Sequence, residues 1–199
     1  MKFFIIGLHG SGKQEVMDIL KQNGIRCGKL FSNIDEPHSE IYNSFNYDLF
    51  TTSDINEIFE NNAYIFINEL DCKSHVNSYK YYEGLTKYEF DNNDVFVISP
   101  DQFLNIPQNT INEQVCFIWM DNTKEDRLTR YKSEKRSYSF SARESIEKRD
   151  IDAFVKPLYN FNNSNILYFM REEPGRVAAI VYSLIKYPDL FNIYNEYYK

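Results

Sequence analysis

A short apolar run that ends in a glycine-rich turn is the feature that most constrains the fold of this chain. Residues Phe3 to Ile6 are all apolar, and Gly7 ends the run. A run without polar alternation is typical of a strand buried on both faces, as in a parallel sheet covered by helices. A helix is predicted from about Gly12 to Gln22, because its apolar residues recur with helical spacing and Asn23-Gly24 supplies a stop. The chain is therefore expected to begin with a buried strand, a glycine turn and a helix.

The turn between this strand and helix has the GxxxxGK spacing of a phosphate-binding loop. Its glycines let the backbone curl until several N–H groups converge on an anion, and the helix N-terminus adds partial positive charge. Lys13 is placed to reach the β- and γ-phosphates of a nucleotide. The alternative is an ordinary glycine-rich turn of an α/β protein, but the position between a buried strand and a helix favours phosphate binding. The residues assigned to nucleotide binding are Gly7, His9, Gly10, Ser11, Gly12, Lys13 and Gln14.

The eighth position of the motif departs from the usual pattern. Gln14 stands where a Ser or Thr hydroxyl would normally bind Mg²⁺. A Gln carbonyl is still able to accept a hydrogen bond from metal-bound water, so nucleotide binding need not be lost. We expect ATP as the phosphate donor and Mg²⁺ as its counterion, with the protein ligands of the metal left open.

Further apolar runs and helical segments alternate along the chain. Strands are predicted at 95–98, 116–120 and 166–169, and helices at 124–136, 141–154, 174–186 and 192–198. Ser141 and Glu144 have the spacing of a capping box, and Pro174 lies at a first-turn position. This alternation predicts an α/β fold with a mainly parallel sheet.

The stretch from Ser32 to Phe90 has a different amino-acid composition. Asn, Tyr and Ser are frequent there, and one short strand is predicted, at 63–67. We interpret the stretch as a lobe inserted into a single domain of residues 1–199, whose core spans about 1–31 and 91–199. The phosphate-loop motif makes this a predicted P-loop three-layer α/β fold.

The overall charge limits the partners. The 199 residues include 22 Lys and Arg against 29 Asp and Glu, a net charge of −7, and 43% are hydrophobic. A negative field argues against nonspecific binding to duplex nucleic acid and against docking on an anionic membrane, so small molecules are the expected partners. The apolar start is too short for a signal sequence and no run is long enough for a membrane span, so we expect a cytoplasmic protein. Three scattered cysteines predict neither a disulfide framework nor a zinc site.

One segment reverses the acidic balance. Thr123–Arg149 carries nine basic against five acidic side chains, a local excess of four positive charges. Arg127, Arg130 and Arg136 lie on a predicted helix and its exit, as expected for a lid, at about 127–149, that closes over phosphates. The alternative is a solvated pair of charged helices. We favour the lid because a phosphate loop is present, and we assign Arg127 to nucleotide binding and Lys13 to catalysis.

Taken in order, these features resemble the guanylate kinase family of nucleoside monophosphate kinases. After the phosphate loop, the lobe contains the segments that carry the resemblance: Glu36–Glu40, Tyr47–Phe50, Ser53–Phe59 and Lys80–Thr86. The Arg-rich segment and Ile146-Glu147-Lys148-Arg149 follow in the same order. The resemblance implies transfer of the ATP γ-phosphoryl group to a nucleoside or deoxynucleoside monophosphate, with the acceptor bound in the lobe. It also implies a catalytic role for Arg130, Arg136 and Arg149, which the local excess of positive charge supports.

The resemblance also implies an acceptor site. Its residues would be Ser32, His38, Glu40, Tyr47, Glu69, Tyr81, Tyr82 and Asp101. Glu40 and Glu69 are the carboxylates expected to accept hydrogen bonds from a purine edge. Asp101 follows a predicted strand, where it would serve Mg²⁺ or its waters, and the equally weighted alternative is an aspartate near a helix N-cap. The two arginines that hold the acceptor phosphate in the family are missing from Ser32–Glu40.

The sequence thus predicts an ATP-dependent phosphotransferase acting on small-molecule nucleotides. Gln14 and the missing arginines keep a second class open, a catalytically altered guanylate kinase-like module that binds a nucleotide or a protein without turnover. The base and sugar of the acceptor, and the choice between a monomer and a homodimer, are not determined by the sequence.

Overall fold

The computed structural model describes residues 1–8, 10–33, 47–73, 78–107, 110, 115–133 and 165–197, with only the backbone described for 70–73, 78–79 and 131–133. In this part of the chain, a four-stranded parallel sheet with the order β6-β1-β7-β8 forms the core. Its strands are β1 (Lys2–Gly7), β6 (Val95–Ile98), β7 (Val115–Asp121) and β8 (Ile166–Met170). The four predicted strands and their parallel arrangement are confirmed.

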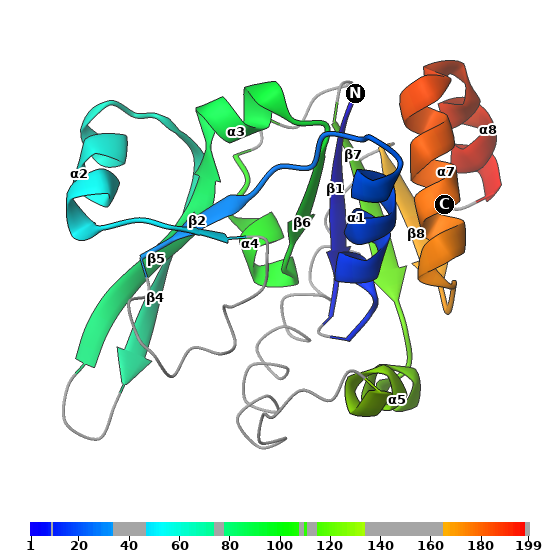
Figure 1. The fold of residues 1–199 in the computed structure, drawn as a ribbon, viewed down its shortest axis with the longest axis horizontal. Helices are drawn as coiled ribbons and strands as arrows, with labels where there is room; N and C mark the ends of the chain where they lie inside the picture. Colours follow the sequence, from blue (N-terminus) through cyan, green and yellow to red (C-terminus); the bar gives the residue numbers. More distant parts are fainter. Residues whose placement is uncertain are drawn as a thin grey trace.

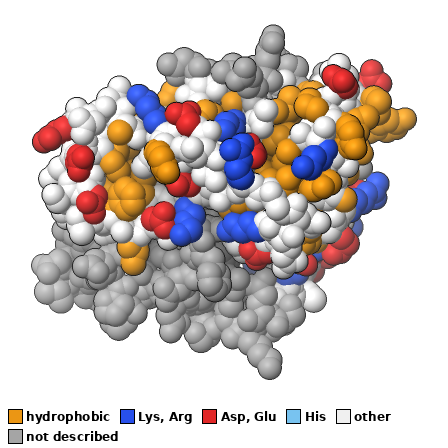
Figure 2. All heavy atoms as spheres, turned by 45° about the horizontal axis from the view of Figure 1, so that its top comes forward, with side chains coloured by type: hydrophobic (Ala, Val, Ile, Leu, Met, Phe, Trp, Pro, Cys, Tyr) orange, Lys and Arg blue, Asp and Glu red, His pale blue; other side chains and the backbone are white. Residues whose placement is uncertain are grey.

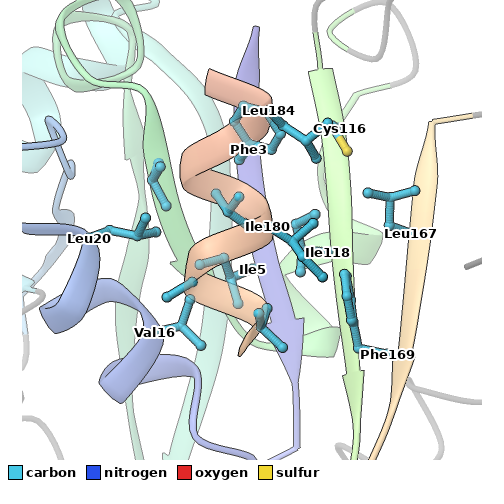
Figure 3. Close-up of a cluster of buried hydrophobic side chains, with 14 of the residues drawn as sticks. Phe3, Ile5, Val16, Leu20, Cys116, Ile118, Leu167, Phe169, Ile180 and Leu184 are labelled. Carbon is cyan, nitrogen blue, oxygen red and sulfur yellow. The ribbon is translucent and has the colours of Figure 1, made fainter. Parts of the chain in front are cut away.

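One face of this sheet is covered by α1 (Lys13–Gln22) and α7 (Pro174–Lys186), with α8 (Phe191–Tyr197) at the outer side. Figure 3 shows how side chains from β1, β7 and β8 meet side chains from the two helices. Phe3 and Ile5 point into this cluster and are fully buried. Their alternation with Phe4 and Ile6, which belong to the cluster on the other face, is the period of two expected of a strand.

The opposite face packs against α4 (Pro100–Leu104) and against the inserted lobe. Phe103 of α4 lies edge-on to Phe117 and Trp119 of β7, with ring centroids 4.9 and 5.5 Å apart. Phe66 and Leu85 of the lobe belong to the same buried cluster. The lobe is therefore attached to the core by apolar packing.

The lobe is built on a second, mixed sheet with the order β3-β2-β5-β4. Its elements are β2 (Leu30–Ser32), β3 (Tyr47–Leu49), α2 (Thr52–Glu60), β4 (Tyr64–Lys73), β5 (Ser78–Thr86) and α3 (Lys87–Asn92). Strand β4 is longer than the predicted 63–67, because its polar second half pairs with β5 as far as Lys73 and Ser78. Figure 1 shows this lobe to the left of the parallel sheet.

Strand β8 differs from the prediction in burial. Its apolar run suggested burial on both faces, but β8 is one of the two edge strands of this sheet, and within it only Leu167 and Phe169 are buried. The predicted helix at 141–154 and the end of the helix at 124–136 lie outside the described residues. The same holds for His9, His38, Glu40, Arg136 and Arg149.

Helix α5 (Lys124–Ser133) follows β7 and lies at the carboxyl end of the sheet, below α1 in Figure 1. The Thr123 hydroxyl accepts a hydrogen bond from the Asp126 N–H and donates to its carboxylate, which fixes the helix start. This contact lowers the pKa of Asp126. Among the described helices, none is long and apolar enough to cross a membrane.

The surface carries charges of both signs. On the face in Figure 2, Lys and Arg side chains are interspersed with Asp and Glu, and hydrophobic side chains gather on the right. That is the side of α7 and α8 in Figure 1, where Tyr187, Ile193 and Tyr197 are exposed.

Candidate functional site

The glycine turn joins the end of β1 to the start of α1. Gly10 and Gly12 have φ angles of +77° and +90°, which are strained for residues with a side chain. The Ser11 N–H donates to the Leu8 carbonyl at 3.1 Å. The Lys13 ammonium folds back and donates to the same oxygen at 3.1 Å. The turn is thus a curled loop with a positive charge held over it, directly before the N-terminus of a helix.

The segment from Met120 to Arg130 wraps around this loop and approaches each of its three glycines. A Cβ on Gly7 would lie 2.8 Å from the Met120 carbonyl oxygen, and one on Gly10 would lie 3.0 Å from the Arg127 carbonyl oxygen. A Cβ on Gly12 would stand less than 3.0 Å from Arg130 Nη1. All three glycines are therefore required by close packing, and Gly10 and Gly12 also by backbone conformation.

Two of the predicted lid arginines lie at the loop. Arg127 is 7% exposed, and its backbone and Cβ pack on Gly10. Arg130 Nη2 lies 3.1 Å from Glu173 Oε2, and its Nη1 lies 3.7 Å from Glu15 Oε2. These contacts hold the Arg130 guanidinium between the first turn of α1 and the start of α7, beside the loop.

Asn122 is a buried contact of the loop that the sequence interpretation missed. It lies directly after β7, is 7% exposed, and its side-chain N–H donates to the Ser11 carbonyl at 2.8 Å. The only sequence signal was its position, because a polar residue at the carboxyl end of a strand beside β1 faces the same sheet edge as the loop.

The side chain of Gln14, at the position where the motif normally supplies a metal ligand, is engaged within α1. Gln14 donates from Nε2 to Asp18 Oδ1 at 2.8 Å, which directs its side chain along α1. In the described ranges, no group of three or more His, Cys, Asp or Glu side chains is arranged to hold a metal. Mg²⁺ in phosphotransfer sites needs only one or two carboxylates besides phosphates and water, so nucleotide-borne Mg²⁺ is compatible with this chemistry.

A second group of polar side chains lies where the lobe meets α4. Ser32, Glu83 and Asn68 occupy facing positions on β2, β5 and β4, and all three are buried. We call these three residues the polar row. It lies on the face of the lobe sheet that also carries Phe66 and Leu85, and therefore faces the core.

Helix α4 completes this group. Asn68 Nδ2 donates to Asp101 Oδ2 at 2.8 Å and to Glu83 Oε1 at 3.3 Å. Asn105 in turn donates from Nδ2 to Asn68 Oδ1 at 2.8 Å. The amide of Asn68 thereby joins the two carboxylates of Glu83 and Asp101.

Tyr47 also belongs to the group of polar side chains where the lobe meets α4. Gln102 Nε2 donates to the Tyr47 hydroxyl at 3.0 Å. Burial, followed by the nearby Glu83 carboxylate, raises the pKa of Tyr47 well above its ordinary value, so the hydroxyl stays protonated. Gln102 also caps α4 together with Ser99, which places Asp101 in the first turn of a helix as the second interpretation of that residue required.

Of the predicted acceptor residues, the structure brings Ser32, Tyr47 and Asp101 together. Tyr81 lies on the same strand face as Glu83 by alternation. Glu69 points to the other face, where it pairs with Lys80, which lowers the pKa of Glu69.

Tyr82 also lies on that other face and packs edge-on to Phe59 at 5.5 Å. Two members of the group, Asn68 and Glu83, were missed by the sequence interpretation. A polar residue that interrupts the apolar side of a strand, as Asn68 does after Phe66, was the available signal.

Comparison with known proteins bears on the fold. No family model and no curated protein matches the sequence. The crystal structure of guanylate kinase from Anaplasma phagocytophilum matches with a TM-score of 0.55 and 12% identity, over 94% of this chain and 84% of that protein. This chain has a guanylate kinase-like fold. At such low identity the likeness concerns the fold alone.

A second solved structure is an uncharacterised protein from Eubacterium ventriosum, with 13% identity over 94% of this chain and 99% of that protein. Its TM-score of 0.44 is too low to support an argument. The guanylate kinase-like fold therefore rests on the parallel sheet, the mixed lobe sheet and the first match.

Proposed function

We propose that this protein is an ATP-dependent phosphotransferase that acts on a nucleoside or deoxynucleoside monophosphate. The observation that carries the proposal is the loop between β1 and α1, with the Lys13 ammonium folded over it and the Arg130 guanidinium beside it. A curled loop at a helix N-terminus, with the cationic groups of Lys13 and Arg130 beside it, has the chemistry to hold a polyphosphate. The guanylate kinase-like fold supports the choice of this reaction class.

In the proposed reaction, the loop N–H groups and Lys13 hold the β- and γ-phosphates of ATP. An acceptor phosphate oxygen bonds to the γ-phosphorus as the bond from that phosphorus to the β,γ-bridging oxygen breaks, which releases ADP. Arg130 stabilises the charge that moves onto the transferring group and the leaving oxygen. Bound Mg²⁺ would add charge neutralisation across the β- and γ-phosphates, and no described residue is assigned to it.

The acceptor is proposed to bind at the polar row and Asp101. Strands β1 and β6 are parallel neighbours, so the phosphate loop after β1 and helix α4 after β6 start from the same edge of the sheet. Ligands of open parallel sheets bind along this edge. Asn68, Glu83 and the Tyr47 hydroxyl offer hydrogen-bonding groups suited to a base or a sugar, which is a positioning role.

The second candidate is a module that binds a nucleotide without turnover. It is favoured by Gln14, whose amide is held by Asp18 in place of the usual hydroxyl ligand of Mg²⁺. It is also favoured by the carboxylates of Glu83 and Asp101, which would repel an acceptor phosphate placed directly against them.

A panel of ribo- and deoxynucleoside monophosphates, incubated with ATP and Mg²⁺ and analysed for diphosphate products, tests the proposal. We expect turnover of at least one monophosphate by the wild-type protein and none by Lys13→Ala. Binding of ATP without turnover of any acceptor would establish the second candidate. Absence of both binding and turnover would contradict both candidates.

A further inference from the structure

The side chain of Asn122 connects the end of β7 to the phosphate loop, 111 residues away in the sequence. Its N–H donates to the Ser11 carbonyl at 2.8 Å, and both residues are buried. We propose that Asn122 is a positioning residue for polyphosphate binding, which acts by fixing the Ser11–Gly12 peptide. The inference rests on the proposed function, because it concerns how the loop is prepared for phosphates.

Peptide geometry makes this contact directional. The carbonyl and the N–H of a trans peptide point in opposite directions within one plane. When Asn122 holds the Ser11 carbonyl, it therefore also fixes the direction of the Gly12 N–H. Gly12 is the N-cap of α1, and N–H groups at a helix start have no partner within the helix, so this donor is one that an anion uses.

Gly12 needs such an anchor more than an ordinary residue does. Its φ of +90° is one of many conformations open to a glycine, which has more backbone freedom to lose than other residues. A contact that restricts the peptide before the ligand arrives lowers the entropy lost on binding. Asn122 is suited to this task because β7 is a central strand of the sheet and its residues from Val115 to Met120 are buried.

The neighbours of Asn122 are engaged in other contacts. The Asp121 carboxylate accepts a hydrogen bond from the Tyr168 hydroxyl at 2.7 Å, and Thr123 caps α5. Asn122 is thus the residue of this turn whose side chain contacts the loop backbone. Loss of the Asn122 side chain should weaken the binding of a ligand more when that ligand places more phosphates on the loop.

The test compares Asn122→Ala with Asn93→Ala by titration calorimetry with pyrophosphate, ADP and AMP. Asn93 is a matched control, because it also donates from Nδ2 to a backbone carbonyl, that of Glu89 at 3.0 Å. It precedes β6 and so lies at the amino ends of the parallel strands, whereas the loop lies at their carboxyl ends. We expect Asn122→Ala to weaken ADP and pyrophosphate binding on the order of tenfold, the size of one lost hydrogen bond. AMP binding should be unchanged, and Asn93→Ala should match the wild type with all three ligands.

The outcomes separate the inference from the proposed function. Equal binding of ADP and pyrophosphate by wild type and Asn122→Ala would overturn the inference and leave the proposed function standing. A wild-type protein that binds neither ADP nor pyrophosphate would overturn the proposed function, and the inference with it. An equal loss for AMP and ADP would show a general structural role and also overturn the inference.

If Asn122→Ala does not fold, the wild-type protein supplies the measurement. The amide resonance of Gly12 is followed during titration with pyrophosphate. A shift of this resonance that saturates with binding is expected. Binding without a change at the Gly12 amide would overturn the inference.

Discussion

Arg130 and Gly12 are in contact because Gly12 has no side chain. The Arg130 guanidinium lies where a Cβ on Gly12 would stand, less than 3.0 Å from Nη1. An arginine of α5 and the N-cap of α1 are thereby coupled across the phosphate loop. The position of this cation depends on the glycine as much as on its ion pair with Glu173.

Gly12→Ala should therefore weaken ATP binding for two reasons. The substitution strains a residue with a φ of +90° and displaces the Arg130 guanidinium. Gly24→Ala is the matched control, since Gly24 has a φ of +77° but a Cβ there would meet nothing within 4 Å. Gly24→Ala should lose about 1–2 kcal/mol of unfolding free energy in urea. Gly12→Ala should lose more, because its Cβ would also lie 2.6 Å from Pro174 Cγ. ATP affinity should fall only in Gly12→Ala, and equal affinities in the two variants would show that the contact with Arg130 has no role in binding.

Arg130→Met should lower kcat more than it raises the KM for ATP. An arginine that stabilises charge during phosphoryl transfer acts mainly in the transition state, and its loss costs on the order of 10³-fold in kcat. Arg176→Met is the control, because Arg176 pairs with Glu172 on the surface of α7 and should affect stability by at most about 1 kcal/mol. Steady-state kinetics of both variants decide the matter. Near wild-type kcat in Arg130→Met would assign Arg130 to surface packing.

Gln14→Ser should strengthen the Mg²⁺-dependent part of ATP affinity. A serine hydroxyl supplies the ligand that the motif normally provides, whereas the Gln14 amide is held by Asp18. Gln14→Ala removes the amide without adding a hydroxyl and serves as the control. The measurement is calorimetry with and without Mg²⁺. If the two variants respond alike to Mg²⁺, the metal is held without position 14.

Much of the core was predictable because its signals are local. The apolar run of β1 and the spacing from Gly7 to Lys13 specify a buried strand, a loop and a helix, and the structure has them in that order. The partial exposure of β8 was not predictable, because an apolar run does not tell how much of a strand its neighbouring elements cover.

The contacts of the site were harder to predict because they join distant segments. Asn122 meets Ser11 across 111 residues, and neither residue has a local pattern that names the other. In the lobe, the sequence pointed to Glu69, but Asn68 carries the buried contact to Asp101. A shift of one position along a strand moves a side chain to the opposite face of the sheet. Which face is buried here is set by packing on α4, which the local sequence does not reveal.

The pH dependence of the free energy of unfolding offers a test of the burial of the Cys27 thiol. Burial raises the pKa of Cys27 from 9.0 to about 11. Below pH 9 the thiol is protonated in both the folded and unfolded states, so its burial costs nothing. Between pH 9 and 11 the unfolded state ionises first, and the free energy of unfolding falls. Urea unfolding at pH 8, 9, 10 and 11 should show a smaller fall for Cys27→Ala than for the wild type, and parallel curves would contradict the shift.

The central claim is that the loop between β1 and α1 holds the phosphates of ATP, and titration of ATP into Lys13→Ala and Lys21→Ala tests it most directly. Both lysines lie on α1, Lys13 at the loop and Lys21 in the last turn. Loss of a charged hydrogen bond to phosphate should weaken ATP binding about 10- to 100-fold in Lys13→Ala. Lys21→Ala should bind ATP like the wild type. Equal ATP affinity in the wild type and both folded variants would contradict the claim.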